Sequence, residues 1–190
     1  YNFDELELAQ GLSLSSHTGG VFDYDITATT FDYLHSHQRL PTVALPAGFT
    51  GGAGTDAELD GTFWYTLDAN GKWRPNDSHT VSFGAHQDSY LLDNPKFALA
   101  NWQSDAKGAT LTLSKGRTQT QAMWAQDVWS LTPDLKLTVG GRYEHWRASH
   151  GLNFSVTPPL NAHQPEVSKS TFSPKAVLYW SPTAAWTFKG

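Results

Sequence analysis

Two histidines in the sequence have the spacing of a metal-binding pair. His35 and His37 are two residues apart, so in a strand both imidazoles would point to one face and could hold one transition-metal ion. No third ligand follows at a readable spacing. We therefore interpret them as ordinary histidines at the rim of a sheet and predict no metal site.

Acidic residues form a second candidate group. Asp56, Glu58 and Asp60 alternate along a glycine-rich segment, and carboxylates are ligands that Ca²⁺ prefers. Their spacing departs from the Asp-x-Asp-x-Asp-Gly pattern of calcium-binding loops. The preferred interpretation is an acidic loop in contact with water.

The sequence contains no arrangement typical of catalysis. No serine lies in a Gly-x-Ser-x-Gly motif, and Gly51–Gly54 lacks the lysine and the following helix of a phosphate-binding loop. Cysteine is absent, which excludes disulfides and thiolate metal sites. Gln126 and Asp127 could act as an amide and an acid, but we interpret them as groups that hold a hairpin. We predict no catalytic residue, no cofactor and no enzymatic activity.

The composition of the chain argues against some further classes of protein. Thirteen basic and eighteen acidic residues give a net charge of −5, which argues against a nucleic-acid partner. No apolar run reaches the roughly 18 residues of a membrane-spanning helix, although barrel strands need only about 9–11 alternating residues. The chain starts without a signal peptide and stops within an alternating segment at 187–190, so we expect an internal part of a longer protein.

The most regular segment is Arg117–Ala148. It predicts two strands joined by a tight turn at Thr132–Asp134, where the fixed φ of Pro133 suits the second turn position. In the second strand apolar and polar residues alternate, so each kind lies on its own face. The apolar face carries Leu135, Leu137, Val139, Gly141 and Tyr143, and the polar face carries Lys136, Thr138, Gly140, Arg142 and Glu144.

This hairpin resembles the barrel hairpins of bacterial TonB-dependent outer-membrane receptors. The resemblance rests on an aromatic-x-Gln-Asp strand, on a Gly-Gly-Arg-Tyr-Glu element in the return strand, and on a similar hairpin that follows. The matching residues are Trp124, Gln126 and Asp127, then Gly140–Glu144, then Phe172–Lys175 and Val177–Thr183. It implies an all-β fold, an antiparallel up-and-down transmembrane β-barrel, of which residues 1–190 are a part.

The resemblance also implies a function and partners. The intact protein would sit in the bacterial outer membrane, surrounded by lipid, and would bind a scarce nutrient, most often an iron–siderophore complex, at its outer face. Its own N-terminal plug domain would fill the lumen, and the TonB energy-transducing protein would act on that plug. Neither the plug nor the remaining strands lie in this chain.

The same alternation predicts about eight strands in all. They are expected at about 6–17, 21–37, 63–73 and 81–92, in the two arms of the hairpin, at 169–180 and from 185 onward. Tight turns alternate with long loops at about 38–60, 93–115 and 149–168, and no helix is predicted. An outer-membrane barrel has this alternation of short periplasmic turns and long extracellular loops.

Aromatic residues suggest two membrane interfaces, and polar residues suggest a lumen. The predicted interface residues are Trp73, Trp129, Trp180 and Trp186 near the tight turns, and Tyr33, Tyr90 and Trp146 at the other strand ends. Lys136, Arg142 and Glu144 are expected to face the lumen.

Four residues near the predicted loops are candidates for ligand capture. Trp102 could stack on an anionic chelate that Lys107 pairs with, and Arg39 and His150 could assist.

A soluble extracellular β-sandwich or jelly-roll that binds carbohydrate through exposed aromatics is the alternative. In that case Phe63, Phe83, Leu137 and Val139 would pack against a second layer of the same molecule.

Overall fold

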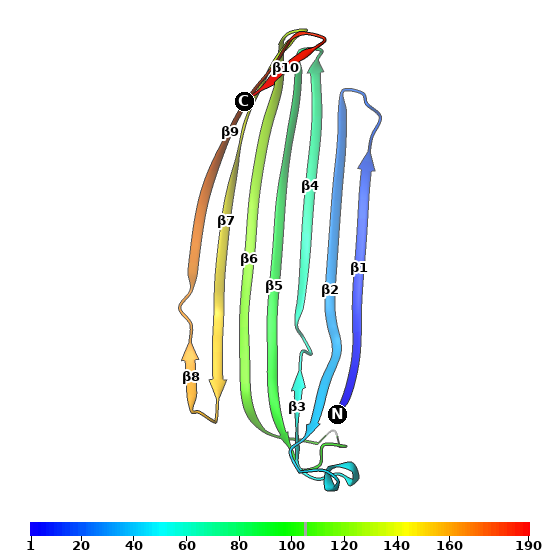
Figure 1. Cartoon of the computed structure of the whole chain (residues 1–190), viewed down its shortest axis with the longest axis vertical. Helices are drawn as coiled ribbons and strands as arrows, with labels where there is room; N and C mark the ends of the chain where they lie inside the picture. Colours follow the sequence, from blue (N-terminus) through cyan, green and yellow to red (C-terminus); the bar gives the residue numbers. More distant parts are fainter. Residues whose placement is uncertain (105) are drawn as a thin grey trace.

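The computed structural model describes residues 1–104 and 106–190, and within them the chain forms one antiparallel sheet of ten strands (Figure 1). A single turn of 3-10 helix, η1 (Ala47–Thr50), lies between β2 and β3. No helix of the described residues is long and apolar enough to cross a membrane. The strands are β1 (Asn2–Ser16), β2 (Phe22–Pro41), β3 (Gly54–Glu58), β4 (Phe63–Asn76), β5 (His79–Leu99), β6 (Lys107–Thr132), β7 (Leu135–Ser155), β8 (Leu160–His163), β9 (Val167–Thr183) and β10 (Trp186–Lys189).

The strands follow one another across the sheet as a meander. β3 and β4 share the position between β2 and β5, and β8 pairs with the far end of β7. The turns that join β1 to β2, β4 to β5, β6 to β7 and β9 to β10 lie at one end of the sheet, which we call the turn end, and β3, η1 and β8 lie at the other, the loop end (Figure 1). This confirms the predicted meander and its tight turns.

Side chains close the tight turns. The Thr132 hydroxyl donates to Asp134 Oδ1 at 2.6 Å, a bond that lowers the pKa of the Asp134 carboxyl. In the turn before β5, Asn76 Oδ1 accepts from the backbone N–H groups of Ser78 and His79 at 2.9 and 3.1 Å. These are the local side-chain bonds that favour Asp, Asn and Thr in turns.

The predicted long loops are wrong in extent. β5 continues to Leu99, β6 starts at Lys107, and β7 continues to Ser155, so much of 93–115 and 149–168 is strand. The segment 38–60 likewise contains the end of β2 and all of β3. Beyond the apolar row the backbone pairing continues, and short alternating stretches such as Ala109–Ser114 in β6 and Leu152–Ser155 in β7 belong to strands.

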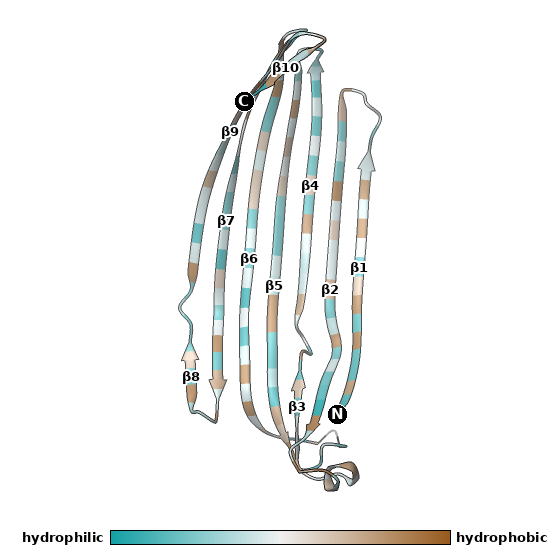
Figure 2. Cartoon of the chain, in the orientation of Figure 1, coloured by the Kyte–Doolittle hydropathy of each residue, from teal (hydrophilic) through white to brown (hydrophobic). Residues whose placement is uncertain are grey.

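The two faces of the sheet differ in chemistry. Residues paired across antiparallel strands share a face, and one such row crosses the whole sheet with apolar residues only. The row runs Leu14, Ile26, Ala69, Ala85, Met123, Tyr143, Phe172. We call the face with this row the apolar face and the opposite one the polar face. Alternating colours along the strands in Figure 2 follow this division.

The apolar face does not pack against a second layer of the described residues. Val139 is 44% exposed and Phe83 is 41% exposed, and among the described residues the buried hydrophobic side chains are Leu99 and Ala122. Because exposed apolar surface on this scale is unfavourable in water, the soluble β-sandwich interpretation is wrong for this sheet.

The apolar residues of the apolar face form a band across the sheet. The length of this band along the strands fits the hydrocarbon core of a lipid bilayer. On β7 the apolar face runs from Leu135 to Tyr143, nine residues, and its next positions are His145 and Arg147. A tilted transmembrane strand needs about 9–11 residues to cross the hydrocarbon core. The remainder of β7, up to Ser155, therefore extends past the band toward the loop end.

Glycines in the band make room for aromatic rings. The Phe83 ring covers Gly71 and the Phe172 ring covers Gly141, each from the neighbouring strand, and a Cβ on either glycine would lie 2.7 Å from the ring. This explains a glycine at position 141, within the motif that carries the family resemblance: a ring lies flat over the backbone there.

Candidate functional site

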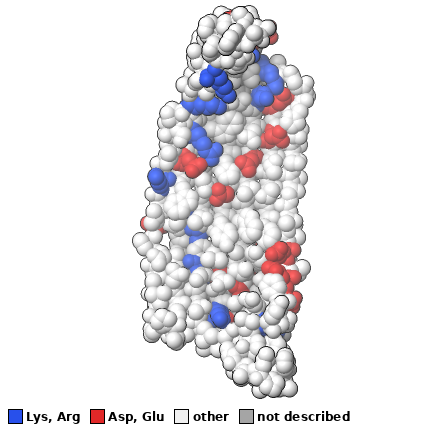
Figure 3. All heavy atoms as spheres, in the orientation of Figure 1, with Lys and Arg blue, Asp and Glu red and all other residues white. Residues whose placement is uncertain are grey.

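Charged side chains gather on the polar face (Figure 3). Arg142 donates to Glu144 Oε2 from Nε and Nη2, at 3.2 and 2.8 Å. His86 lies between two carboxylates, with Nδ1 2.7 Å from Asp68 Oδ1 and Nε2 3.1 Å from Asp88 Oδ2. The predicted lumen-facing residues Lys136, Arg142 and Glu144 all lie on this face, since they alternate with the apolar row through Tyr143.

An aromatic patch lies on the polar face, closer to the loop end. Phe31, Trp64 and Tyr90 pair across β2, β4 and β5, and Tyr33 lies next to them. The rings of Phe31 and Trp64 stack with centroids 4.1 Å apart, and those of Trp64 and Tyr90 are 5.9 Å apart. Tyr33 meets Phe31 edge-on at 5.2 Å. Half-exposed stacked rings of this kind can bind a flat apolar or aromatic group.

The other predicted interface aromatics lie on the face of this patch. Tyr33, Tyr90 and Trp146 are predicted to lie at a membrane interface, but their strand positions place all three on the polar face. Side chains alternate along a strand, so position along the strand does not decide the face. Contact of these three residues with a membrane interface stays a prediction.

The tryptophans near the tight turns are placed differently. Trp73 and Trp129 lie on the apolar face at the turn end, and Trp180 and Trp186 lie there beside Phe188. All four are more than 40% exposed. Their contact with a lipid interface stays a prediction.

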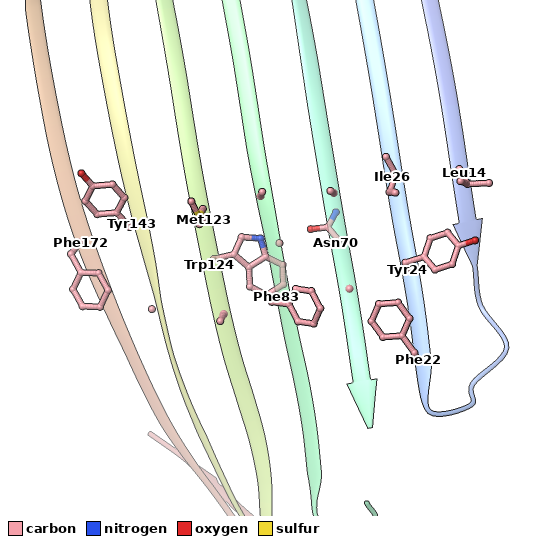
Figure 4. A pocket seen from close by; sticks show the side chains of 16 residues that line it. Leu14, Phe22, Tyr24, Ile26, Asn70, Phe83, Met123, Trp124, Tyr143 and Phe172 are labelled. Carbon is pink, nitrogen blue, oxygen red and sulfur yellow. The ribbon is translucent and has the colours of Figure 1, made fainter. Parts of the chain in front are cut away.

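A shallow groove crosses the apolar face within the band (Figure 4). Rings of Phe22, Phe83, Tyr143 and Phe172 form its walls together with Met123, and small residues form its floor. Its lining offers almost no polar group, so it suits hydrocarbon chains and lacks the polar groups that orient a specific ligand.

The four residues predicted to contact a ligand lie at the loop end, and each contacts another residue of the chain. Trp102 Nε1 donates to the Gly48 carbonyl at 2.9 Å, and Lys107 Nζ lies 2.7 Å from the Glu58 carboxylate. Arg39 Nε is 3.5 Å from Asp56 Oδ2. His150 is apart from these three, with a φ of 57° and Nδ1 3.0 Å from Ser149 Oγ. Ligand binding by these four residues stays a prediction.

The same end of the sheet contains a buried polar cluster. His37, Asp56 and Glu58 are 6%, 1% and 4% exposed. His37 Nδ1 lies 2.7 Å from Asp56 Oδ2, and His37 Nε2 lies 3.2 Å from Asp60 Oδ2. Burial disfavours the charged imidazole, but the neighbouring carboxylates, Asp56 first, outweigh it and raise the pKa of His37.

The cluster brings together the histidine pair and the acidic residues, which are two separate candidate groups in the sequence. His35 and His37 come from β2, Asp56 and Glu58 from β3, and Asp60 from the connection to β4. Their ligand atoms form two groups, His35–His37–Asp60 and His37–Asp56–Glu58, with all atoms of each group within 4.8 Å of one another. The interpretation of the acidic residues as a loop in contact with water is wrong for Asp56 and Glu58, which lie in β3 and are buried.

The chain matches the family model "TonB dependent receptor-like, beta-barrel" over residues 1–190. Comparison with curated proteins gave no significant sequence match.

Two solved structures share the fold. One is the ferric yersiniabactin uptake receptor FyuA from Yersinia pestis, with a TM-score of 0.63 and 14% identity over 95% of this chain. The other is the ferric citrate transporter FecA in its unliganded form, with a TM-score of 0.62 and 13% identity over 96% of this chain. The chain spans about a quarter of either protein, 26% in both cases.

Proposed function

Since the chain belongs to the TonB-dependent receptor family, as part of its β-barrel, we propose that it forms part of the wall of an outer-membrane receptor that takes up an iron–siderophore complex. The apolar face meets lipid, including acyl chains in the groove of Figure 4. The polar face meets the lumen and an N-terminal plug domain, on which the TonB energy-transducing protein acts.

One observation carries this proposal: a single-layered sheet has one apolar and one polar face. In lipid, every backbone N–H and C=O must be paired within the protein, which a closed barrel achieves. The nine-residue height of the apolar band on β7 supports the same assignment. The related folds of FyuA and FecA, whose names refer to ferric yersiniabactin and ferric citrate, favour an iron chelate as the ligand.

We assign ligand contact first to the aromatic patch, because it lies on the lumenal face nearer the loop end. Arg39, Trp102, Lys107 and His150 remain proposed contacts at the extracellular end. The ion pair of Arg142 and Glu144 is the proposed contact with the plug.

The uptake experiment uses the intact receptor in its own outer membrane. Cells lacking the receptor should take up less ⁵⁵Fe from one member of a panel of ferric citrate, hydroxamate, catecholate and phenolate chelates, and the intact gene should restore uptake. Uptake of every chelate at the wild-type rate in the deletion strain would rule out an iron-chelate receptor, and absence of the protein from washed outer membranes would rule out the barrel.

Replacing Trp64 by alanine in the intact receptor should weaken binding of the transported chelate. Loss of one stacked ring removes about 0.5–1.5 kcal/mol, which corresponds to a dissociation constant raised roughly 2–10-fold. Trp146→Ala, on the same face but outside the patch, is the matched control and should bind as the wild type does. Equal affinities of the Trp64 variant and the wild type, measured by fluorescence quenching, would remove the patch from the ligand path.

A further inference from the structure

We propose that His35, His37 and Asp60 bind a divalent transition-metal ion, with Asp56 and Asp4 holding the two imidazoles in place. The ion would join β2 to the connection between β3 and β4 at the loop end of the wall. It would be a structural ion and not the transported cargo. The inference is independent of which ligand the receptor carries.

The two histidines are arranged in the same way. Each ring has one nitrogen beside a carboxylate that is not a proposed ligand. His37 Nδ1 lies 2.7 Å from Asp56 Oδ2, and His35 Nε2 lies 3.3 Å from Asp4 Oδ2. The other nitrogen of each ring faces Asp60 Oδ2, at 3.2 Å from His37 Nε2 and 3.9 Å from His35 Nδ1. A carboxylate behind a metal-bound histidine commonly fixes its tautomer and ring orientation in this manner.

When the His37 imidazole is neutral and its proton is on Nδ1, no hydrogen lies between His37 Nε2 and Asp60 Oδ2. If its Nδ1–H donates to Asp56, the Nε2 lone pair faces the Asp60 carboxylate, and two acceptors lie opposite each other. A cation between them satisfies both. Two imidazoles and one carboxylate form a ligand set that suits Zn²⁺ and its neighbours in the transition series better than Mg²⁺ or Ca²⁺.

The distances fit such an ion. Ligands at about 2.1 Å from a tetrahedral ion are about 3.4 Å from one another. The separations of 3.2 and 3.9 Å to Asp60 lie on either side of that value. The ligand atoms of His35, His37 and Asp60 all lie within 4.8 Å of one another, and the two imidazole rings stack with centroids 4.1 Å apart.

Asp60 is also held in position. The Ser36 backbone N–H donates to its Oδ1 at 2.7 Å, which leaves Oδ2 directed at the histidines. His35 and Asp60 are each 37% exposed, so an ion and its remaining water ligands can enter from solvent.

The charges around the proposed site favour a cation beside Asp60. Lys107 lies 2.7 Å from Glu58, and Arg39 lies 3.5 Å from Asp56, so these two carboxylates already face positive groups. Within residues 1–104 and 106–190, the ion pairs of Asp60 are those with His35 and His37. In addition, Asp56 Oδ1 is buried without a hydrogen-bond partner, and positive charge beside a buried carboxylate stabilises it.

The site lies on the outer side of the wall. His35 pairs with Leu6, whose side chain shares a face with Leu8, Leu12 and Leu14 on β1. β2 has an extra residue at this point, Leu34, which shifts the following histidines to that face. The proposed ion is therefore on the face opposite the aromatic patch.

Zinc binding by the intact receptor tests the proposal. Receptor purified in detergent and treated with EDTA is titrated with ZnCl₂ in calorimetry, and bound zinc is counted by elemental analysis after gel filtration. The wild type should bind one zinc ion more than His37→Gln and one more than Asp60→Asn. The Asn side chain can keep the oxygen that accepts from Ser36, so that variant should fold normally.

Two further variants separate a metal site from a merely structural cluster. Asp56→Asn should keep the stoichiometry and weaken zinc binding by about 10–100-fold, as expected for a residue behind a ligand. His163→Gln, on the exposed β8, should bind zinc as the wild type does. Equal zinc content in the wild type, His37→Gln and Asp60→Asn would overturn the proposal and leave a protonated His37 bridging Asp56 and Asp60.

Discussion

Replacing Val139 by arginine should destabilise the folded barrel by about 2–4 kcal/mol, the cost of a cationic side chain at the bilayer midplane on the lipid side of a barrel strand. Val139 lies at the centre of the nine-residue segment Leu135–Tyr143 and is 44% exposed on the apolar face. Equilibrium unfolding of the intact receptor in lipid vesicles with guanidinium chloride measures the change.

Thr138→Arg is the matched control, because it places the same charge one residue away on the polar face. It should cost much less, since the arginine meets water or the plug. If both variants lose the same stability, the two faces are in similar surroundings and the assignment of the apolar face to lipid fails.

The second large effect is expected at Thr62, which is fully buried at 0% exposure. Its hydroxyl accepts from the Asp93 N–H and donates to the Asp93 carbonyl, both at 2.9 Å, where the sheet is interrupted between β3 and β4. Thr62→Val keeps the shape and removes both bonds. Leaving the part-buried N–H and C=O of Asp93 without these partners should cost about 2–5 kcal/mol.

Thr62→Ser provides the control because it keeps the hydroxyl. Hydrogen exchange of the intact receptor should show faster exchange at β3 and the neighbouring part of β5 in Thr62→Val only. Unchanged protection in that variant would mean that the hydroxyl does not replace the missing strand pairing.

The sequence was sufficient for the sheet, its meander and its turns. Alternation within Leu135–Tyr143 arises because one side meets hydrocarbon and the other meets polar groups, so the pattern reports the physical surroundings directly. Past Tyr143 the alternation on β7 changes phase, with His145 and Arg147 on the formerly apolar side and Trp146 and Ala148 on the other. The continuous pattern is interrupted there, although Ala109–Ser114 in β6 and Leu152–Ser155 in β7 alternate and could have indicated the longer strands.

The histidine–carboxylate cluster was beyond sequence reasoning for a different reason. His37 and Asp60 are 23 residues apart, and they meet because β3 adds antiparallel to the end of β2. The shift of register at Leu34 also changes the face of every following residue. Neither feature leaves a spacing rule in the sequence. The alternation of side chains could, however, have placed Tyr33 and Tyr90 on the polar face.

The most direct test of the lipid-facing wall is a nitroxide scan of residues 136–143 in the intact receptor in bilayers. The chain contains no cysteine, so each introduced cysteine is unique within this segment. We expect oxygen accessibility to peak at 137, 139, 141 and 143, and a water-soluble nickel reagent to reach those positions least. Accessibility without a period of two, or with its maxima at 136, 138, 140 and 142, would contradict the account.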